Sequence, residues 1–184
     1  LPGHKTTTAD AVKAYVQSML ASKCATWVQL PHELWPASWK GKYSKPMVLL
    51  VKSLYGHPEA GAHWERHLEK IIAQMGGTAI PEFPSSYFFK KEGLLLTVYV
   101  DDFTLSGPVE NHAAFWLRLR KDVELEKEGG LERILGRHHD ELTIESKAYL
   151  AFNMEDYAVQ ACELFGTVSG GKTPEARLPR FAPR

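Results

Sequence analysis

The stretch LLLTVYVDDFTLS at residues 94–106 decides the fold. It consists of an apolar run, two adjacent acidic residues, Asp101 and Asp102, and a second β-prone run. A further short run at residues 86–90 precedes it, separated by Lys91-Glu92-Gly93. Short β-prone runs joined by tight turns predict a meander of three antiparallel strands. Residues 94–100 are apolar at both alternating positions, so we expect a central strand there.

Two amphipathic helices are predicted on either side of this meander. In residues 59–75, apolar side chains recur at three- and four-residue steps, and Gly76-Gly77 ends the pattern. A second helix is expected at residues 110–127, where Phe115, Leu119 and Val123 share one face. Strands and helices mix without strict alternation, which predicts an α+β fold with helices packed on one face of an antiparallel sheet.

The remaining elements are predicted from shorter signals. We expect a helix at residues 9–22 that is entered at Asp10, a strand at 26–30, a loop at 32–45 and an extended stretch at 46–54. Further along, we expect a strand pair near 133–144 and a helix near 153–165. From residue 170 the chain is rich in Gly, Pro and Arg, which predicts a basic tail or linker.

The composition is that of a globular protein. The chain has 184 residues, with 22 Lys and Arg against 22 Asp and Glu, 44% hydrophobic residues and 24% charged residues. This balance excludes a basic tail-like binder, a collagen-like fibre and a disulfide mini-protein. Two distant cysteines and the absence of an apolar leader predict a reduced, intracellular protein with no membrane partner. The chain begins with Leu1, as expected for a piece of a longer product or for a processed chain.

Asp101 and Asp102 are the strongest candidates for chemistry. A tight hairpin would hold both carboxylates at the tip of a rigid element, where their repulsion favours a cation or a proton. Mg²⁺ prefers such oxygen ligands, and Asp-Asp is also an ordinary turn sequence. Asp10 is either a helix N-cap or a third carboxylate facing the tip. Three convergent carboxylates can hold two metal ions for phosphoryl transfer.

Histidines give weaker signals. His63 and His67 lie four residues apart on the predicted helix, but no Glu follows His63 as in the zinc motif H-E-x-x-H. We therefore predict that they are surface or half-buried residues. His138 and His139 are adjacent on a predicted strand, where side chains point to opposite faces, which favours a surface strand over a metal site.

The box Tyr99-Val100-Asp101-Asp102 resembles the catalytic box of reverse transcriptases. The surrounding blocks resemble the copia-type family of LTR retrotransposons. These blocks are residues 10–20, 26–31, 52–56 with Ala60 and Trp64, 83–89, Gly130-Leu131 with Leu135-Gly136, and Phe165-Gly166 with Thr173-Pro174. They follow the family's order over about residues 10–174.

The resemblance implies a polymerase-palm-like sheet in a domain of residues 1–169, with part of the fingers within about 24–58 and the tail at 170–184. It implies an RNA-directed DNA polymerase in which Asp10, Asp101 and Asp102 bind two Mg²⁺ ions, with Mn²⁺ as a possible substitute. Its partners would be an RNA template, a DNA primer, a dNTP and the integrase and RNase H of a Pol polyprotein. The location would be cytoplasmic, in virus-like particles if the element is intact.

Three residues are expected at the substrate. Tyr15 would lie under the sugar of the nucleotide and exclude a 2′-hydroxyl, although a core aromatic is an equal alternative. Tyr99, in the catalytic box, and Glu59, at the position where the family has a Gln near template and nucleotide, complete the predicted substrate-binding set.

The chain departs from the family at Glu59, at Gly61-Ala62 in place of Pro-Arg, and at residues 137–140 in place of an apolar strand. An acid at position 59 would repel phosphate. These departures favour a second hypothesis, an inactive relic that keeps the fold and acts at most as a nucleic-acid-binding or interaction module. A third is an unrelated α+β domain with a turn-forming Asp-Asp. The separation of the carboxylates of Asp10 and Asp101 distinguishes the first hypothesis from the third.

Overall fold

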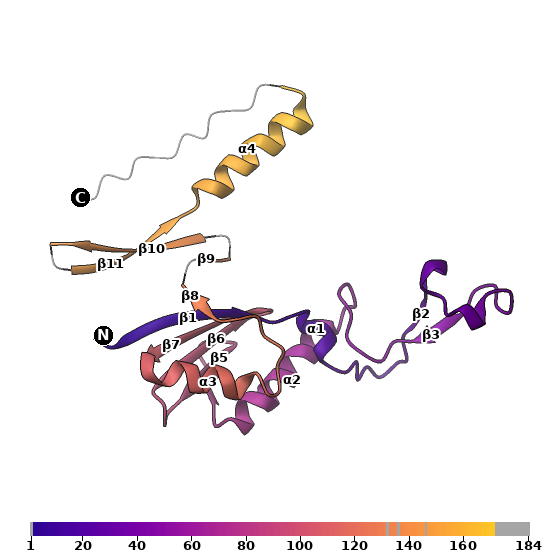
Figure 1. Ribbon diagram of the computed structural model, residues 1–184, viewed down its shortest axis with the longest axis horizontal. Coiled ribbons are helices and arrows are strands. Elements are labelled where there is room, and N and C mark those ends of the chain that lie inside the picture. Colours follow the sequence, from indigo (N-terminus) through magenta and orange to yellow (C-terminus); the bar gives the residue numbers. More distant parts are fainter. Residues whose placement is uncertain (1, 132, 136, 146, 172–184) are drawn as a thin grey trace. The chain divides into compact units, whose positions relative to one another are not determined.

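The computed structural model describes residues 2–131, 133–135, 137–145 and 147–171. The chain comprises two compact units, Leu1–Gly129 and Gly130–Arg184 (Figure 1). Sheets and helices occur together in both units, which confirms the predicted α+β class. None of the described helices combines the length and apolar character needed to cross a membrane.

An antiparallel sheet organises the first unit, in the order β4-β5-β6-β7-β1-β8. Its strands are β1 (His4–Asp10), β4 (Thr78–Ala79), β5 (Ser86–Phe89), β6 (Leu94–Tyr99), β7 (Asp102–Pro108) and β8 (Gly129–Gly130). The meander β5-β6-β7 agrees with the prediction from residues 86–106. The sequence did not predict β1, which adds to the outer side of β7 in antiparallel register along its whole length.

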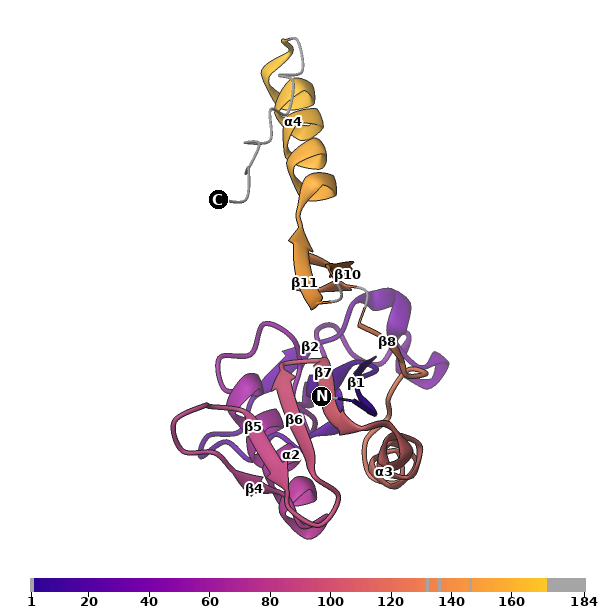
Figure 2. The same ribbon diagram turned by 90° about the vertical axis from the view of Figure 1, so that its left-hand side faces the viewer.

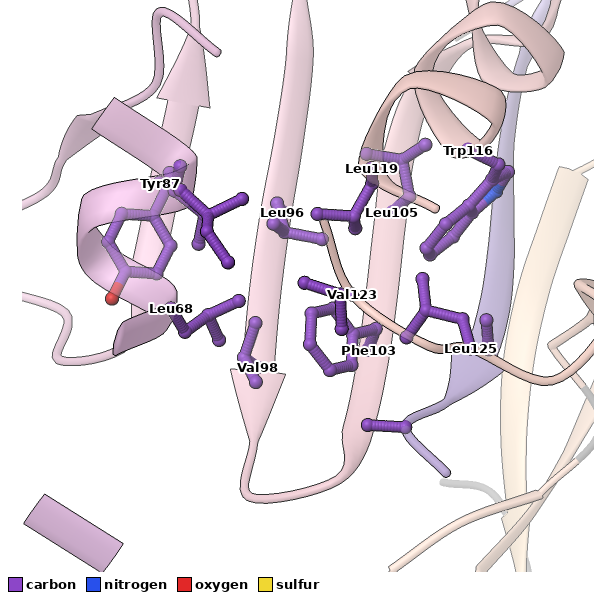
Figure 3. Close-up of a cluster of buried hydrophobic side chains, with 14 of the residues drawn as sticks. Leu68, Tyr87, Leu96, Val98, Phe103, Leu105, Trp116, Leu119, Val123 and Leu125 are labelled. Atoms are coloured by element: carbon purple, nitrogen blue, oxygen red, sulfur yellow. The ribbon is translucent and has the colours of Figure 1, made fainter. Parts of the chain in front are cut away.

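The helices α2 (Ala60–Gln74) and α3 (His112–Leu119) pack on the same face of this sheet (Figures 2 and 3). One continuous core joins them. Its main side chains are Trp64, Leu68, Ile71 and Ile72 of α2, Phe115, Trp116 and Leu119 of α3, and Tyr87, Phe89, Leu94, Leu96, Val98, Phe103 and Leu105 of the sheet. This arrangement confirms the prediction of helices on one face.

Polar side chains of α3 and β1 that reach the core bond to one another. The Trp116 indole N–H donates to Thr7 Oγ1 at 2.9 Å, and the same hydroxyl lies 2.8 Å from His112 Nδ1. Burying these groups without partners would be costly, so the chain of three side chains ties α3 to β1.

The other sheet face has a different composition. The register of β1, β7 and β6 places side chains of this face in three rows that cross the three strands. The rows are Thr6, Ser106 and Leu95; then Thr8, Thr104 and Thr97; then Asp10, Asp102 and Tyr99. All nine side chains are half-buried or exposed. Side chains on successive residues alternate between faces, so the apolar residues lie under the helices and the hydroxyls and acids on the opposite face.

The predicted helix at residues 9–22 is wrong over most of its length. Asp10 ends strand β1, and the only helix in this stretch is α1 (Ala14–Gln17). The pairing of β1 with β7 draws Ala9 and Asp10 into the sheet, so Asp10 is not a helix N-cap. Bridges from Ala11 to Leu125 and from Met19 to Lys52 fix the chain on either side of α1.

The second predicted helix is also shorter than expected. Beyond Leu119 the chain turns, with the Val123 amide still donating to the Leu119 carbonyl at 3.0 Å, and Leu125 then enters the core from the segment that bridges Ala11. Val123 is therefore buried at the predicted spacing, although the regular helix ends at Leu119.

The strands β2 (Trp27–Gln29) and β3 (Met47–Leu49) form a separate antiparallel pair. They lie within the stretches predicted as extended at 26–30 and 46–54. The loop predicted between them contains two 3₁₀ turns, His32–Leu34 and Ala37–Trp39.

The second unit contains the strands β9 (Arg133–Ile134), β10 (Arg137–Ile144) and β11 (Lys147–Asn153), followed by α4 (Glu155–Ser169). The strand pair and the final helix agree with the prediction, whereas β11 was missed. The predicted tail lies outside the described residues beyond Gly171.

Truncation of the core face of α3 should destabilise the first unit far more than truncation of its outer face. Leu119 has no exposed surface, so Leu119→Ala should lower the free energy of unfolding by about 2–5 kcal/mol. Leu117, on the same helix, is 69% exposed, and Leu117→Ala should change the free energy of unfolding by less than about 0.5 kcal/mol. Urea titration measures both, and equal effects would contradict the described packing.

Candidate active site at the strand ends

The register of three strands brings the predicted acids together. Asp10, the last residue of β1, lies directly opposite Asp102, the first residue of β7. Asp102 in turn pairs with Tyr99 at the end of β6, and Asp101 lies in the two-residue turn between them. The three carboxylates and Tyr99 therefore lie at one end of the sheet, although 91 residues separate Asp10 from Asp101.

Two hydrogen bonds hold the backbone of the turn. The Trp64 indole N–H of α2 donates to the Val100 carbonyl at 2.7 Å, and the Ala11 amide donates to the Asp101 carbonyl at 2.7 Å. Val100 has a φ of 58°, which is unfavourable for a β-branched residue. Such a conformation persists where surrounding contacts determine it, as these two bonds do here.

The acids influence one another electrostatically. Asp102 is half-buried, whereas Asp10 and Asp101 are exposed. Burial raises the pKa of the Asp102 carboxyl, and the neighbouring charges of Asp10 and Asp101 raise it further. A carboxylate crowded by two others is stabilised by a cation, as the sequence argument anticipated.

Tyr15 and Tyr99 line the same pocket of about 270 Å³ beside the turn. The other lining residues are Gly61, Trp64, Glu65, Leu68, Ser85, Tyr87, Val98 and Val100. Tyr15 is half-buried, packs against the core and lies with its ring 4.5 Å from that of Tyr55. The ring thus both fills space and forms a wall of the pocket, and the two sequence-based alternatives for Tyr15 are compatible.

Glu59 lies apart from this pair. It precedes α2 and lines a second pocket of about 610 Å³ together with His57, His63 and Arg66. A hydrogen bond from the Ser22 hydroxyl lowers the pKa of its carboxyl, with further lowering by the nearby histidines and Arg66. The structure therefore places this predicted substrate residue in a different pocket from Tyr15 and Tyr99.

The carboxylates at the strand ends are the best candidates for a metal site. Among the described residues, no group of three or more His, Cys, Asp or Glu is arranged to hold a metal ion. Mg²⁺, however, is commonly bound by one or two carboxylates together with the phosphates of a substrate. The paired side chains of Asp10 and Asp102, with Asp101 beside them, fit that mode of binding.

The other histidines take structural roles. His138 pairs with Asp156 at 2.9 Å, and the His139 ring packs against Phe152 with centroids 5.0 Å apart. His63 is buried and His67 is half-buried, so the prediction for this pair is correct for His67 and wrong for His63.

Sequence reasoning missed the part that Trp64 plays at the turn. The apolar spacing of residues 59–75 predicted a helix with a core side, and Trp64 lies on that side. A buried indole still needs a hydrogen-bond acceptor, and that requirement was the signal for a second contact.

A scan against protein-family models and a search of curated proteins find no match to this chain. The resemblance to copia-type reverse transcriptases therefore stays a prediction from the residues quoted above.

Replacement of Asp102 should stabilise the protein in a pH-dependent way. Its raised pKa in the folded state means that the ionised carboxylate opposes folding at neutral pH. Asp102→Asn should therefore raise the urea midpoint at pH 7, and the gain should fade as the pH drops through the folded pKa toward the ordinary value of 3.8.

Urea titrations between pH 3 and pH 8 measure this gain. Glu82→Gln, at an exposed loop position, is the control and should show no such pH dependence. A gain for Asp102→Asn that is absent at pH 7 or that grows toward pH 3 would contradict the described crowding of carboxylates.

Proposed function

We propose that this chain is the palm, with part of the fingers, of a copia-type retrotransposon reverse transcriptase. In this proposal it is an RNA-directed DNA polymerase that transfers a nucleotide from a dNTP to the 3′-hydroxyl of a primer. The observation that carries the proposal is the alignment of Asp10 with Asp102 at the tip of the Tyr99–Asp102 hairpin. This is the end of the sheet at which the family resemblance expects the catalytic acids.

Asp10, Asp101 and Asp102 would hold two Mg²⁺ ions, or Mn²⁺ in their place. When bound, the metal supplies charge neutralisation at the phosphate and helps to deprotonate the attacking hydroxyl. The chain contributes the carboxylates on a fixed backbone, because Trp64 and Ala11 hold the turn that carries Asp101 and leads into Asp102. The raised pKa of Asp102 is the electrostatic sign that this cluster favours an added positive charge.

The substrate would be oriented by the aromatic residues beside the acids. Tyr15 is held by the Tyr55 ring and by the core, so it presents a fixed surface on which a sugar can rest. Tyr99 extends the row of Asp10 and Asp102 on the same sheet face. In this way the two tyrosines would restrict where the nucleotide lies relative to the carboxylates.

The template and primer would lie on the sheet face that carries hydroxyl side chains. The rows formed by Thr6, Ser106, Thr8 and Thr104 lead directly to Asp10 and Asp102. Hydroxyls of Ser and Thr are common donors to nucleic-acid phosphates and sugars. The integrase and RNase H of a Pol polyprotein, and cytoplasmic virus-like particles, belong to the same proposal.

One observation favours the alternative, an inactive relic that retains the fold. The lowered pKa of Glu59 keeps that carboxyl ionised at the position where the family has a neutral Gln. A negative charge there repels phosphate, and the side chain lines a pocket apart from Tyr15 and Tyr99.

Primer extension tests the proposal. With poly(rA)-oligo(dT), dTTP and Mg²⁺, the folded protein should incorporate nucleotide, and Asp101→Asn should reduce the rate by about a hundredfold or more. Glu110→Gln, in the exposed 3₁₀ turn Val109–Asn111 that follows the opposite end of β7, should leave the rate unchanged. Equal rates for Asp101→Asn and the unaltered chain would contradict the assigned role of the acid. Absence of incorporation by well-folded protein at every concentration would overturn the polymerase and favour the relic.

A further inference from the structure

Helix α2 carries its charges on separate sides. His63 and His67, and likewise Arg66 and Lys70, are four residues apart, and three residues separate the first members of the two pairs, so the four side chains form a single basic stripe. Glu65 and Glu69 lie on another side, where their charges act on Tyr87 of β5. A chain with no net charge therefore has a locally positive surface along this helix.

The basic stripe forms one wall of a groove of about 360 Å³, lined by Met19, Ala21, His63, Arg66, His67 and Lys70. The segment around Met19 forms the opposite wall, and an antiparallel bridge to Lys52 fixes it. A hydrogen bond of 3.0 Å between the buried hydroxyls of Ser18 and Ser53 reinforces that bridge. The residues lining this groove include two fixed cations, Arg66 and Lys70, two histidines and no acid.

Arg66 is held in place by a buried histidine. Its Nη2 donates to His63 Nδ1 at 3.0 Å, and His63 is only 7% exposed. A guanidinium can only donate, so Nδ1 accepts this hydrogen bond, while the other ring nitrogen, Nε2, lies 3.4 Å from the Ser22 hydroxyl. The contact uses one of the five N–H donors of Arg66 and orients the planar group before any ligand arrives.

His67 lies among further charges. It is half-buried, with its ring 6.0 Å from that of Trp64. Burial lowers its pKa, the charges of Lys52 and Lys70 lower it further, and Asp122 acts in the opposite direction. At the other end, the carboxylate of Glu59 acts on His63 and Arg66 in the neighbouring pocket. An anion in the groove would offset the mutual repulsion of the cations around His67.

We propose that the groove between α2 and the Met19 segment binds consecutive phosphate groups, either of a free oligophosphate or of a nucleic-acid strand. Arg66 would contact one phosphate through its oriented guanidinium, while Lys70, Lys52 and protonated His67 would neutralise the next. This site uses other side chains than the Asp10–Asp102 cluster, and it does not depend on the proposed polymerase activity.

Calorimetry with tripolyphosphate tests the site directly, in EDTA so that metal binding plays no part. The unaltered chain should bind tripolyphosphate, and Arg66→Gln/Lys70→Gln should weaken binding about tenfold or more. Lys90→Gln/Lys91→Gln removes two exposed charges from a distant turn and is the matched control, which should bind as the unaltered chain does. Circular dichroism checks that each variant is folded. Equal affinity for both double variants, or no binding by the unaltered chain, would overturn the proposal.

Two further measurements sharpen the test. The pKa of His67, followed by NMR, should rise when tripolyphosphate is added, and an unchanged pKa would contradict an anion beside it. Fluorescence anisotropy with single-stranded oligo(dT) identifies the source of the phosphates. A loss of oligo(dT) binding in Arg66→Gln/Lys70→Gln supports strand phosphates, whereas binding of tripolyphosphate alone supports a free oligophosphate. Primer extension is not part of these readouts, so failure of one proposal is distinguishable from failure of the other.

Discussion

The register between β1 and β7 is the constraint on which the candidate site depends. Ala9 and Phe103 face each other in the core, so Asp10 and Asp102, one residue further along, face each other on the opposite side of the sheet. A slip of one residue would turn Asp10 into the core and expose Ala9. The burial of Ala9 and Phe103 therefore specifies the meeting of two acids that are far apart in the sequence, even though their charges oppose it.

One side of helix α2 contacts the turn between β6 and β7, and another side lines the groove beside Met19. Its core side buries Leu68 and Ile72 and directs the Trp64 N–H to the turn between β6 and β7. Its outer side carries Arg66 and Lys70 into the groove beside Met19. A change that moved this helix would thus affect the hairpin tip and the basic groove together, whereas the substitutions chosen for the groove leave its core side intact.

Much of the first unit could be predicted because its elements are encoded locally. The repeated apolar spacing of α2 and the turn before Leu94 lie within short windows of sequence. The strand that ends in Ala9 and Asp10 could not be predicted, because β1 exists through pairing with a strand more than 90 residues away. The same holds for Leu125, which reaches the core where its segment bridges Ala11. At the site, the sequence itself shows that Asp101 and Asp102 are adjacent. That they lie beside Asp10 follows only from the pairing of β1 with β7. No nearby sequence pattern indicated that Glu59 lines a separate pocket.

Paramagnetic NMR tests most directly the proposed cation site at Asp10, Asp101 and Asp102. Low concentrations of Mn²⁺ should broaden the amide signals of these residues and of Tyr99, while Lys5 and Gly107, paired at the other end of the same strands, should stay sharp. Uniform broadening along β1 and β7, or broadening confined to another part of the chain, would contradict a metal site at the strand ends.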